Sequence, residues 1–229
     1  MALNYYKNEL KENAQLLASK GKGILAVDES TKTVGKRLAG IGVENTEENR
    51  KAYRGMLFTT EGLGKYISGA ILFEETLFQN HQDGEPMVKK LNDLGIIPGI
   101  KVDKGLNPLP GGGDVETFCS GLDGLVERAA KYYEQGARFA KWRAVLQITD
   151  DGCPSKLSIQ ENAWGLARYA RSVQESGLVP IIEPEILMDG AHTIEKTAEI
   201  QEEVIKQVYI ACQANGVFLE GTLLKPSMT

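Results

Sequence analysis

The sequence predicts an α/β fold built from repeated strand–helix units around a parallel sheet. Six short apolar segments of strand length recur along the chain, and helical patterns separate them. The segments begin on average about 40 residues apart, which is typical of a (β/α)8 barrel with long loops. No linker or low-complexity tract interrupts the chain, so we expect one domain over residues 1–229.

The six expected strands are short and apolar. They are Gly23–Val27, Ala70–Phe73, Ile96–Ile100, Phe139–Leu146, Leu178–Ile182 and Val217–Leu224. Strands that lack polar alternation fit a parallel sheet covered on both faces. Between them we expect helices with apolar residues three and four apart, several of which end at a glycine. These helices are Arg50–Phe58, Val88–Leu94, Leu122–Gln135, Ser158–Glu175 and Thr193–Ala214.

Composition excludes several classes of protein. Apolar residues make up 42% of the chain, which is enough for a core and excludes intrinsic disorder. The sequence contains no run of 18 apolar residues to span a membrane, and its start has no recognisable targeting segment. A net charge of −5 with mixed signs argues against a nucleic-acid partner. Three cysteines and two histidines, not spaced as metal ligands, indicate reduced thiols and predict no metal site and no cofactor.

Charged residues stand at the carboxyl ends of the expected strands, where an unpaired buried charge is costly. They include Asp28, Glu29, Lys101, Lys141, Arg143, Glu183, Glu185 and Lys225. Side chains two residues apart in a strand share a face, so Lys141 and Arg143 point the same way, as do Glu183 and Glu185. In a parallel barrel these faces converge on the mouth, where active sites lie.

Lysines and carboxylates gathered in one cavity have a definite chemistry. A lysine crowded by cations and partly desolvated has a lowered pKa, so its neutral amine attacks a carbonyl and forms a Schiff base. Nearby carboxylates then act as general acid and base, and further cations hold an anion such as phosphate. Plainer interpretations stay open from spacing alone: structural ion pairs for Lys101, Lys141 and Glu183, and a capped, solvated helix turn for Arg50.

Eight motifs stand in order between Leu10 and Thr229. They are GILAVDEST, KRLAGIGVENTEENR, ISGAILFEETL, GIKVDKG, CSGLDGL, FAKWR, VPIIEPEIL and LEGTLLKPSM. On these motifs the chain resembles the class I fructose-bisphosphate aldolases, the Schiff-base and metal-independent type, and AWGLARYA is similar to their plastid and algal branch. The resemblance implies a (β/α)8 barrel that reversibly cleaves fructose 1,6-bisphosphate into dihydroxyacetone phosphate and glyceraldehyde 3-phosphate, in glycolysis, gluconeogenesis or the Calvin cycle.

The resemblance also implies a role for each matching residue. Lys225 matches the Schiff-base lysine, and Glu183 matches the general acid and base of imine formation. Asp28 matches the acid that takes the proton of the C4 hydroxyl, and Lys141 matches the lysine beside the imine.

A second set matches positions around the substrate. Lys101, Arg143 and Arg37 match cations near its phosphates and hydroxyls, and Glu185 and Glu29 match carboxylates that hold the lysines. Arg50 and Thr33 match further substrate-binding positions; Thr33 stands where the family has a serine.

The chain differs from the family in where it stops, shortly after Lys225. We therefore expect only the first six βα units, a fragment that by itself is unstable or self-associates and has little activity. At full length the resemblance implies a homotetramer in the cytoplasm, or in a plastid if the N-terminus is a mature start. Two alternatives stay open: a Schiff-base aldolase acting on sedoheptulose 1,7-bisphosphate, and a non-catalytic fragment or scaffold protein that keeps the fold.

Overall fold

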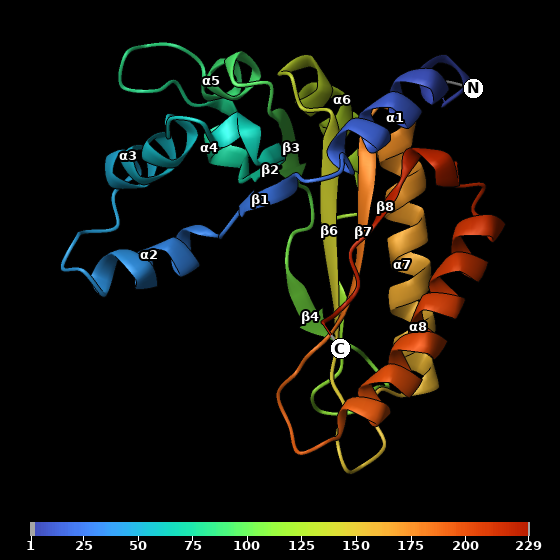
Figure 1. The fold of residues 1–229 in the computed structure, drawn as a ribbon. Coiled ribbons are helices and arrows are strands. Elements are labelled where there is room, and N and C mark those ends of the chain that lie inside the picture. The colour runs from blue at the N-terminus through green and yellow to red at the C-terminus, as the bar shows by residue number, and fades with distance from the viewer. Residues whose placement is uncertain (1–2, 229) are drawn as a thin grey trace.

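The computed structural model describes residues 3–228, in which six parallel strands form a curled, open sheet (Figure 1). The strand order is β1-β2-β3-β6-β7-β8, so β1 and β8 are the two edges. The strands are β1 Gly23–Val27, β2 Ile67–Leu72, β3 Ile97–Lys101, β6 Phe139–Leu146, β7 Val179–Ile186 and β8 Leu223–Leu224. All neighbouring pairs run parallel. The chain is therefore an α/β protein whose sheet is a parallel half-barrel.

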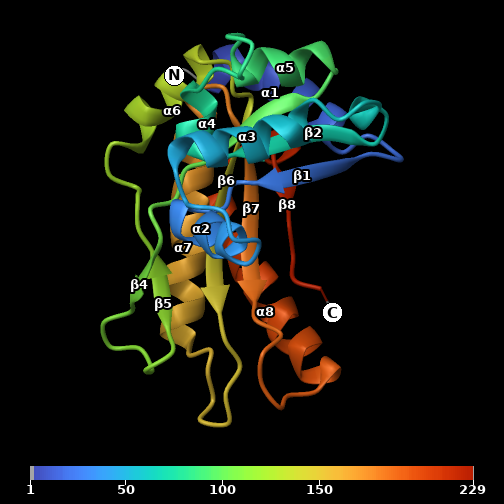
Figure 2. The same ribbon diagram turned by 90° about the vertical axis from the view of Figure 1, so that its left-hand side faces the viewer.

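Helices follow most of the strands. They are α1 Leu3–Leu17, α2 Thr31–Ala39, α3 Glu47–Phe58, α4 Glu74–Phe78, α5 Met87–Asp93, α6 Leu125–Glu134, α7 Lys156–Gln174 and α8 Ile194–Ala214. The long helices α7 and α8 lie side by side along β6 and β7 (Figures 1 and 2). Trp142 of β6 and Tyr169 of α7 stack between these layers, with ring centroids 5.3 Å apart. Within residues 3–228, none of the helices has the length and apolarity needed to cross a bilayer.

Helix α1 closes one end of the half-barrel. It lies across the amino ends of β6 and β7 (Figure 1), where Leu10 and Leu17 are buried against Phe139 and Val179. Burial of each such apolar side chain contributes about 1.5–3 kcal/mol to the stability of the folded chain. Helix α1 therefore covers the amino ends of β6 and β7, and the charged residues lie at the opposite, carboxyl ends of the strands.

Two side-chain caps shape the chain as it leaves β1. Ser30 is the N-cap of α2, and its Oγ accepts a hydrogen bond of 3.3 Å from the amide of Thr33. Thr46 is the N-cap of α3, and its Oγ1 accepts one of 3.1 Å from the amide of Asn49. The turn into α2 therefore begins directly after Asp28 and Glu29, which leaves both carboxylates at the strand end.

A β-hairpin that the sequence analysis did not predict interrupts the strand–helix alternation. Strands β4 Leu106–Pro108 and β5 Thr117–Cys119 pair in antiparallel fashion (Figure 2). Buried Glu116 fixes the turn of the hairpin to the start of α7: its carboxylate accepts hydrogen bonds from the Gly113 amide (2.8 Å) and from the Ser155 amide (2.6 Å) and hydroxyl (2.8 Å). Burial raises the pKa of Glu116, but these hydrogen bonds outweigh it and hold the pKa below its usual value.

The sixth expected strand is wrong over most of its length. Leu219–Gly221 form a 3-10 turn, and only Leu223–Leu224 pair with β7. The side chain of Gln174 takes the place of a neighbouring strand here. It donates to the carbonyls of Phe218 (2.8 Å) and Gly221 (3.1 Å) and accepts from the Phe218 amide (2.9 Å). The second expected strand is displaced, because it begins at Ile67 and gives way at Phe73 to the start of α4.

Candidate functional site

The carboxyl ends of the strands border a cleft of about 420 Å³. Its walls come from β3, β6 and β7, from the segment between β1 and the first turn of α2, and from the start of β4. Most of the sequence-predicted site residues line it, namely Asp28, Glu29, Thr33, Lys101, Lys141, Arg143, Glu183 and Glu185. The parallel register explains the gathering, because Lys101 lies opposite Lys141, and Arg143 lies opposite Glu183.

Lys141 is the buried centre of the cleft. Its Nζ donates a hydrogen bond of 2.9 Å to Asp28 Oδ2 and lies 3.4 Å from Glu183 Oε2. The lowered pKa expected of a crowded lysine does not apply to Lys141. Burial lowers its pKa, but the charges of Asp28 and Glu183 outweigh it and leave the pKa above its ordinary value. Lys141 is therefore charged at neutral pH.

Lys225 and Lys141 approach the same carboxylate from two sides. Lys225 Nζ donates a short hydrogen bond to Glu183 Oε1, while Glu183 itself is almost completely buried. The Lys225 side chain is 54% exposed, so its amine is open to a ligand. The pairing of β7 with β8 sets this contact, since the Lys225 amide donates to the Ile182 carbonyl at 2.9 Å. A carboxylate between two lysines can take a proton from one while the other stabilises its charge.

Two further carboxylates hold arginines, and not the lysines that the resemblance implied. Glu185 accepts a short hydrogen bond from Arg143, and Glu29 accepts one from Arg37. Glu183 and Glu185 are two residues apart on β7, and Lys141 and Arg143 are two residues apart on the neighbouring strand β6. Side chains two residues apart share a face, so Glu183 meets Lys141 and Glu185 meets Arg143. Both arginines are therefore held at the cleft by a carboxylate.

Asp103 is a site residue that the predicted set omitted. It accepts a hydrogen bond of 2.6 Å from Lys101 Nζ, and its side chain is almost completely buried. The signal was present in the sequence, since Lys101 and Asp103 are two residues apart at the end of a predicted strand. The structure adds that Asp103 lines the cleft beside Lys101.

Arg50 lies apart from the residues that line the cleft. Its Nε and Nη2 donate to the two oxygens of Glu75 at 3.0 and 2.6 Å, and its Nη1 donates to Asn45. The hydrogen bonds from Arg50 to Glu75 and the nearby acids raise its pKa in spite of its burial. Arg54, one helical turn further along α3, was not predicted at all; its Nη1 lies 3.6 Å from Glu75, and its Nη2 donates to the Glu29 carbonyl at 2.7 Å.

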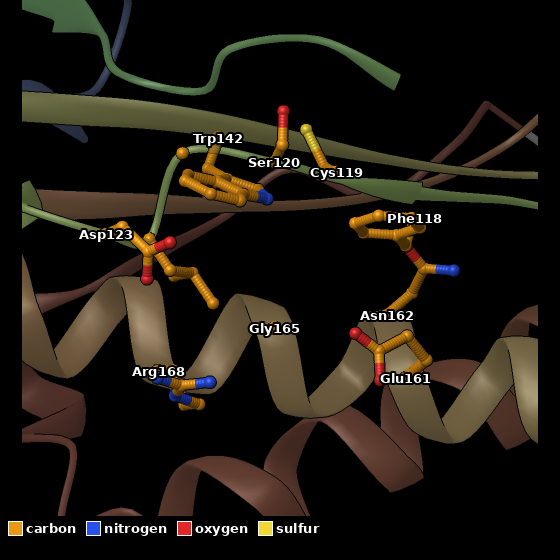
Figure 3. Close-up of a pocket in the computed structure, with 11 residues that line it drawn as sticks. Phe118, Cys119, Ser120, Asp123, Trp142, Glu161, Asn162, Gly165 and Arg168 are labelled. Atoms are coloured by element: carbon orange, nitrogen blue, oxygen red, sulfur yellow. The ribbon is translucent and has the colours of Figure 1, made fainter. Parts of the chain in front are cut away.

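A separate cavity of about 210 Å³ lies on the helix side of β6. Figure 3 shows Trp142 and Phe118 on one side of it, and Glu161 and Arg168 of α7 on the other. None of the eleven predicted site residues, all of which the structure describes, lines this cavity. Trp142 points away from Lys141 and Arg143 because neighbouring side chains alternate along a strand. Elsewhere in residues 3–228, no group of three histidine, cysteine or carboxylate side chains is placed to hold a metal ion.

Comparisons with known proteins agree with this arrangement of residues. The family model described as "Glycolytic: Fructose-bisphosphate aldolase class-I" matches residues 9–229. The chain is 58% identical over 223 residues to the chloroplastic fructose-bisphosphate aldolase 3 of Arabidopsis thaliana, covering 97% of this chain and 56% of that relative. It is 61% identical over 221 residues to fructose-bisphosphate aldolase 2 of Plasmodium berghei, covering 96% of this chain and 60% of that one.

A solved structure extends the likeness to three dimensions. The fructose-bisphosphate aldolase of Plasmodium falciparum, crystallised with TRAP and a small molecule inhibitor, superposes with a TM-score of 0.95 at 58% identity. The match covers 97% of this chain and 64% of that one. The chain thus spans little more than half the length of the curated relatives it matches. It belongs to the class I fructose-bisphosphate aldolase family.

Proposed function

We propose that this chain carries the lysine Schiff-base chemistry that cleaves fructose 1,6-bisphosphate into dihydroxyacetone phosphate and glyceraldehyde 3-phosphate. One observation carries the proposal. The Glu183 carboxylate lies between Lys225 and Lys141, and Lys141 joins it to Asp28. An exposed amine, a buried acid–base group and a second carboxylate are the three parts that imine formation and carbon–carbon cleavage need.

Imine formation uses Lys225 and Glu183. Glu183 takes a proton from Lys225, and the neutral amine attacks the C2 carbonyl of the open-chain sugar to form a carbinolamine. Glu183 then returns a proton to the leaving hydroxyl, which departs as water and leaves an iminium ion. The positive charge of Lys141 beside Glu183 stabilises the ionised carboxylate in both directions.

Cleavage uses Asp28. Asp28 takes the proton of the C4 hydroxyl, the C3–C4 bond breaks, and its electron pair moves into the iminium to form an enamine. Glyceraldehyde 3-phosphate leaves as the aldehyde. Protonation of the enamine at C3 and hydrolysis of the imine then release dihydroxyacetone phosphate and restore Lys225.

The remaining cations bind the substrate in this proposal. Lys101 and Arg143 line the cleft, and Arg37 is exposed at its edge, so the three supply positive charge for the two phosphates. Thr33 places a hydroxyl at the first turn of α2 beside that of Ser30, 3.1 Å away. Arg50 has a substrate-binding role only if the Glu75 pair opens, because its guanidinium is held by Glu75 and Asn45.

The proposal extends to the whole protein. The six strands are the first six of a (β/α)8 barrel and form a single domain, which the likeness to a longer aldolase chain supports. In this proposal the whole protein is a homotetramer that acts on a phosphorylated sugar, and family membership supports the substrate class. Several relatives, from Arabidopsis thaliana, Spinacia oleracea and Oryza sativa, are named chloroplastic, which favours a plastid over the cytoplasm.

Trapping of the imine tests the chemistry directly. The chain is incubated with dihydroxyacetone phosphate, reduced with borohydride and mapped by mass spectrometry. We expect a reduced adduct on Lys225 that Lys225→Met abolishes. The matched control is Lys104→Met, which removes an exposed lysine outside the cleft lining and should leave the adduct unchanged.

The competing outcomes distinguish the alternatives. Adducts spread over exposed lysines, or no adduct on a folded sample, would contradict the proposal and favour a non-catalytic fragment or a scaffold protein. Competition between fructose 1,6-bisphosphate and sedoheptulose 1,7-bisphosphate for the adduct then identifies the preferred sugar.

A further inference from the structure

Arg54 is a completely buried cation with unused hydrogen-bond donors. Its side chain has no exposed surface, and its guanidinium lies over the ring of Phe73 at 5.5 Å. Only Nη2 is satisfied, by the Glu29 carbonyl at 2.7 Å. Within the described residues, Nε and Nη1 have no hydrogen-bond partner, although Nη1 lies 3.6 Å from Glu75 Oε1 in an ion pair. Buried polar groups are nearly always paired, so donors left free beside a cleft require an explanation.

The matching free acceptor belongs to Glu29. Its Oε1 accepts from Arg37, whose side chain is 57% exposed, and its Oε2 is buried without a hydrogen-bond partner in residues 3–228. Arg54 already touches the backbone of this same residue. Arg54 therefore lies beside Glu29, and the Glu29 charge acts on its guanidinium.

We propose that Glu29 is a switch carboxylate that leaves Arg37 for Arg54 when a phosphate group binds Arg37. The proposal rests on the proposed function for the identity of the anion, a sugar phosphate. Arg54 is a positioning residue in this scheme, since it touches the cleft only through Glu29. No covalent step is involved; one ion pair opens and another forms.

Electrostatics gives the switch its direction. The Glu29 charge stabilises the Arg54 cation against burial, which by itself lowers the pKa of Arg54. The other charges facing Arg54 are Glu75 and Arg50, which already neutralise one another in a bidentate pair. When phosphate takes Arg37, the partly buried Glu29 would be left without a cation, unless Arg54 receives it. Without Arg54, Glu29 stays on Arg37 and competes with the phosphate.

The test follows inorganic phosphate binding by NMR of the chain labelled with 15N-arginine. In the unsubstituted protein we expect phosphate to shift the Nε–H resonances of both Arg37 and Arg54, the second as it gains the Glu29 carboxylate. Arg54→Met should weaken phosphate binding at Arg37 about tenfold. Adding Glu29→Gln to Arg54→Met should restore the affinity, because the neutral amide no longer holds Arg37 by charge. A purely structural role of Arg54 would not be rescued in this way.

The single variant Glu29→Gln keeps the test valid if Arg54→Met fails to fold. In this variant, phosphate should still shift Arg37 but no longer shift Arg54. Arg168→Met, which removes an exposed arginine on α7, is the control and should change neither resonance. An equal loss of affinity from Arg54→Met with and without Glu29→Gln, an Arg54 resonance that phosphate never moves, or no phosphate binding at Arg37 would overturn the switch. The proposed function is judged separately by the adduct on Lys225.

Discussion

The Asp28 carboxylate accepts a hydrogen bond of 2.9 Å from the Lys141 ammonium, 113 residues further along the chain. Asp28 directly follows β1 and Lys141 belongs to β6, and these strands are not neighbours in the sheet, because β2 and β3 lie between them. The pair therefore reaches across the hollow of the half-barrel, and it forms only because the sheet curls. The candidate active site and the curvature of the fold depend on each other through this contact.

Replacement of Lys141 by methionine should destabilise the chain most near neutral pH. The substitution leaves Asp28 buried without its cation and leaves Glu183 with Lys225 alone. Removing one partner of a buried ion pair typically costs about 3–5 kcal/mol. The native pKa of Lys141 is raised above its ordinary value of 10.5. Its stabilising contribution is therefore complete below pH 10.5 and is lost as the pH rises through the native pKa.

Urea unfolding of both proteins between about pH 8 and pH 12 measures this difference. The gap between the unsubstituted chain and Lys141→Met should narrow at the alkaline end. Lys206→Met, on the exposed face of α8, serves as the control. A gap that stays constant over the whole range would show that the Lys141 charge does not stabilise the fold.

Glu183→Gln should slow imine formation on Lys225 by about 100-fold or more, the range expected for loss of a general acid–base group. The glutamine keeps the size of the side chain but can neither take the Lys225 proton nor protonate the departing hydroxyl. Time-resolved borohydride trapping with dihydroxyacetone phosphate measures the rate. Glu161→Gln, which replaces an exposed acid on α7, should trap at the original rate. Similar rates for Glu183→Gln and the unsubstituted chain would remove Glu183 from the mechanism.

Glu116→Gln should loosen the link between the β4–β5 hairpin and α7. The amide can accept hydrogen bonds at one oxygen only. Either the Ser155 amide at Oε1, or the Gly113 amide and the Ser155 hydroxyl at Oε2, therefore lose their acceptor, at a cost of about 1–3 kcal/mol. The native pKa of Glu116 is lowered from 4.5. Its contribution is therefore present above pH 4.5 and is lost as the pH falls through the native pKa.

Thermal unfolding at about pH 7 and in acid tests the Glu116 prediction. The variant should melt earlier than the original at neutral pH and approach it in acid. Glu127→Gln on the exposed side of α6 is the matched control. Equal melting temperatures at neutral pH would contradict the role given to Glu116.

The two sheet edges should cause the chain to associate as its concentration rises. An apolar cleft between β1 and β8 is lined by residues such as Ile24, Ile71, Ile181 and Leu224. Unpaired parallel edges beside apolar surface are templates for pairing with another copy. Ala26→Lys, which places a charge in this cleft, should shift sedimentation profiles toward the monomer. Val126→Lys on α6 should not, and equal effects of the two variants would show that added charge alone decides solubility.

The strands flanked by helices were the predictable part of the fold. β1 and β6 have the predicted bounds, and β3 and α8 begin within one residue of them, because continuous apolar runs and terminal glycines are local signals. Helix α1 was missed although Leu10 and Leu17 are among its buried residues, since most of its other positions are polar. Val217–Leu224 was wrong because the side chain of Gln174, distant in sequence, takes the place of a neighbouring strand.

The residue types and spacings of the sequence alone determined the parallel α/β class and the gathering of charge at the strand ends, because side-chain alternation and strand polarity are local properties. The tertiary structure decided the partners. Curling of the sheet brings Lys141 to Asp28, and the β7–β8 register brings Lys225 to Glu183. In the folded chain, Glu29 and Glu185 bind arginines and not lysines, and Arg54 is buried beside Glu29. Such pairings depend on distances between segments far apart in the chain, which no local pattern encodes.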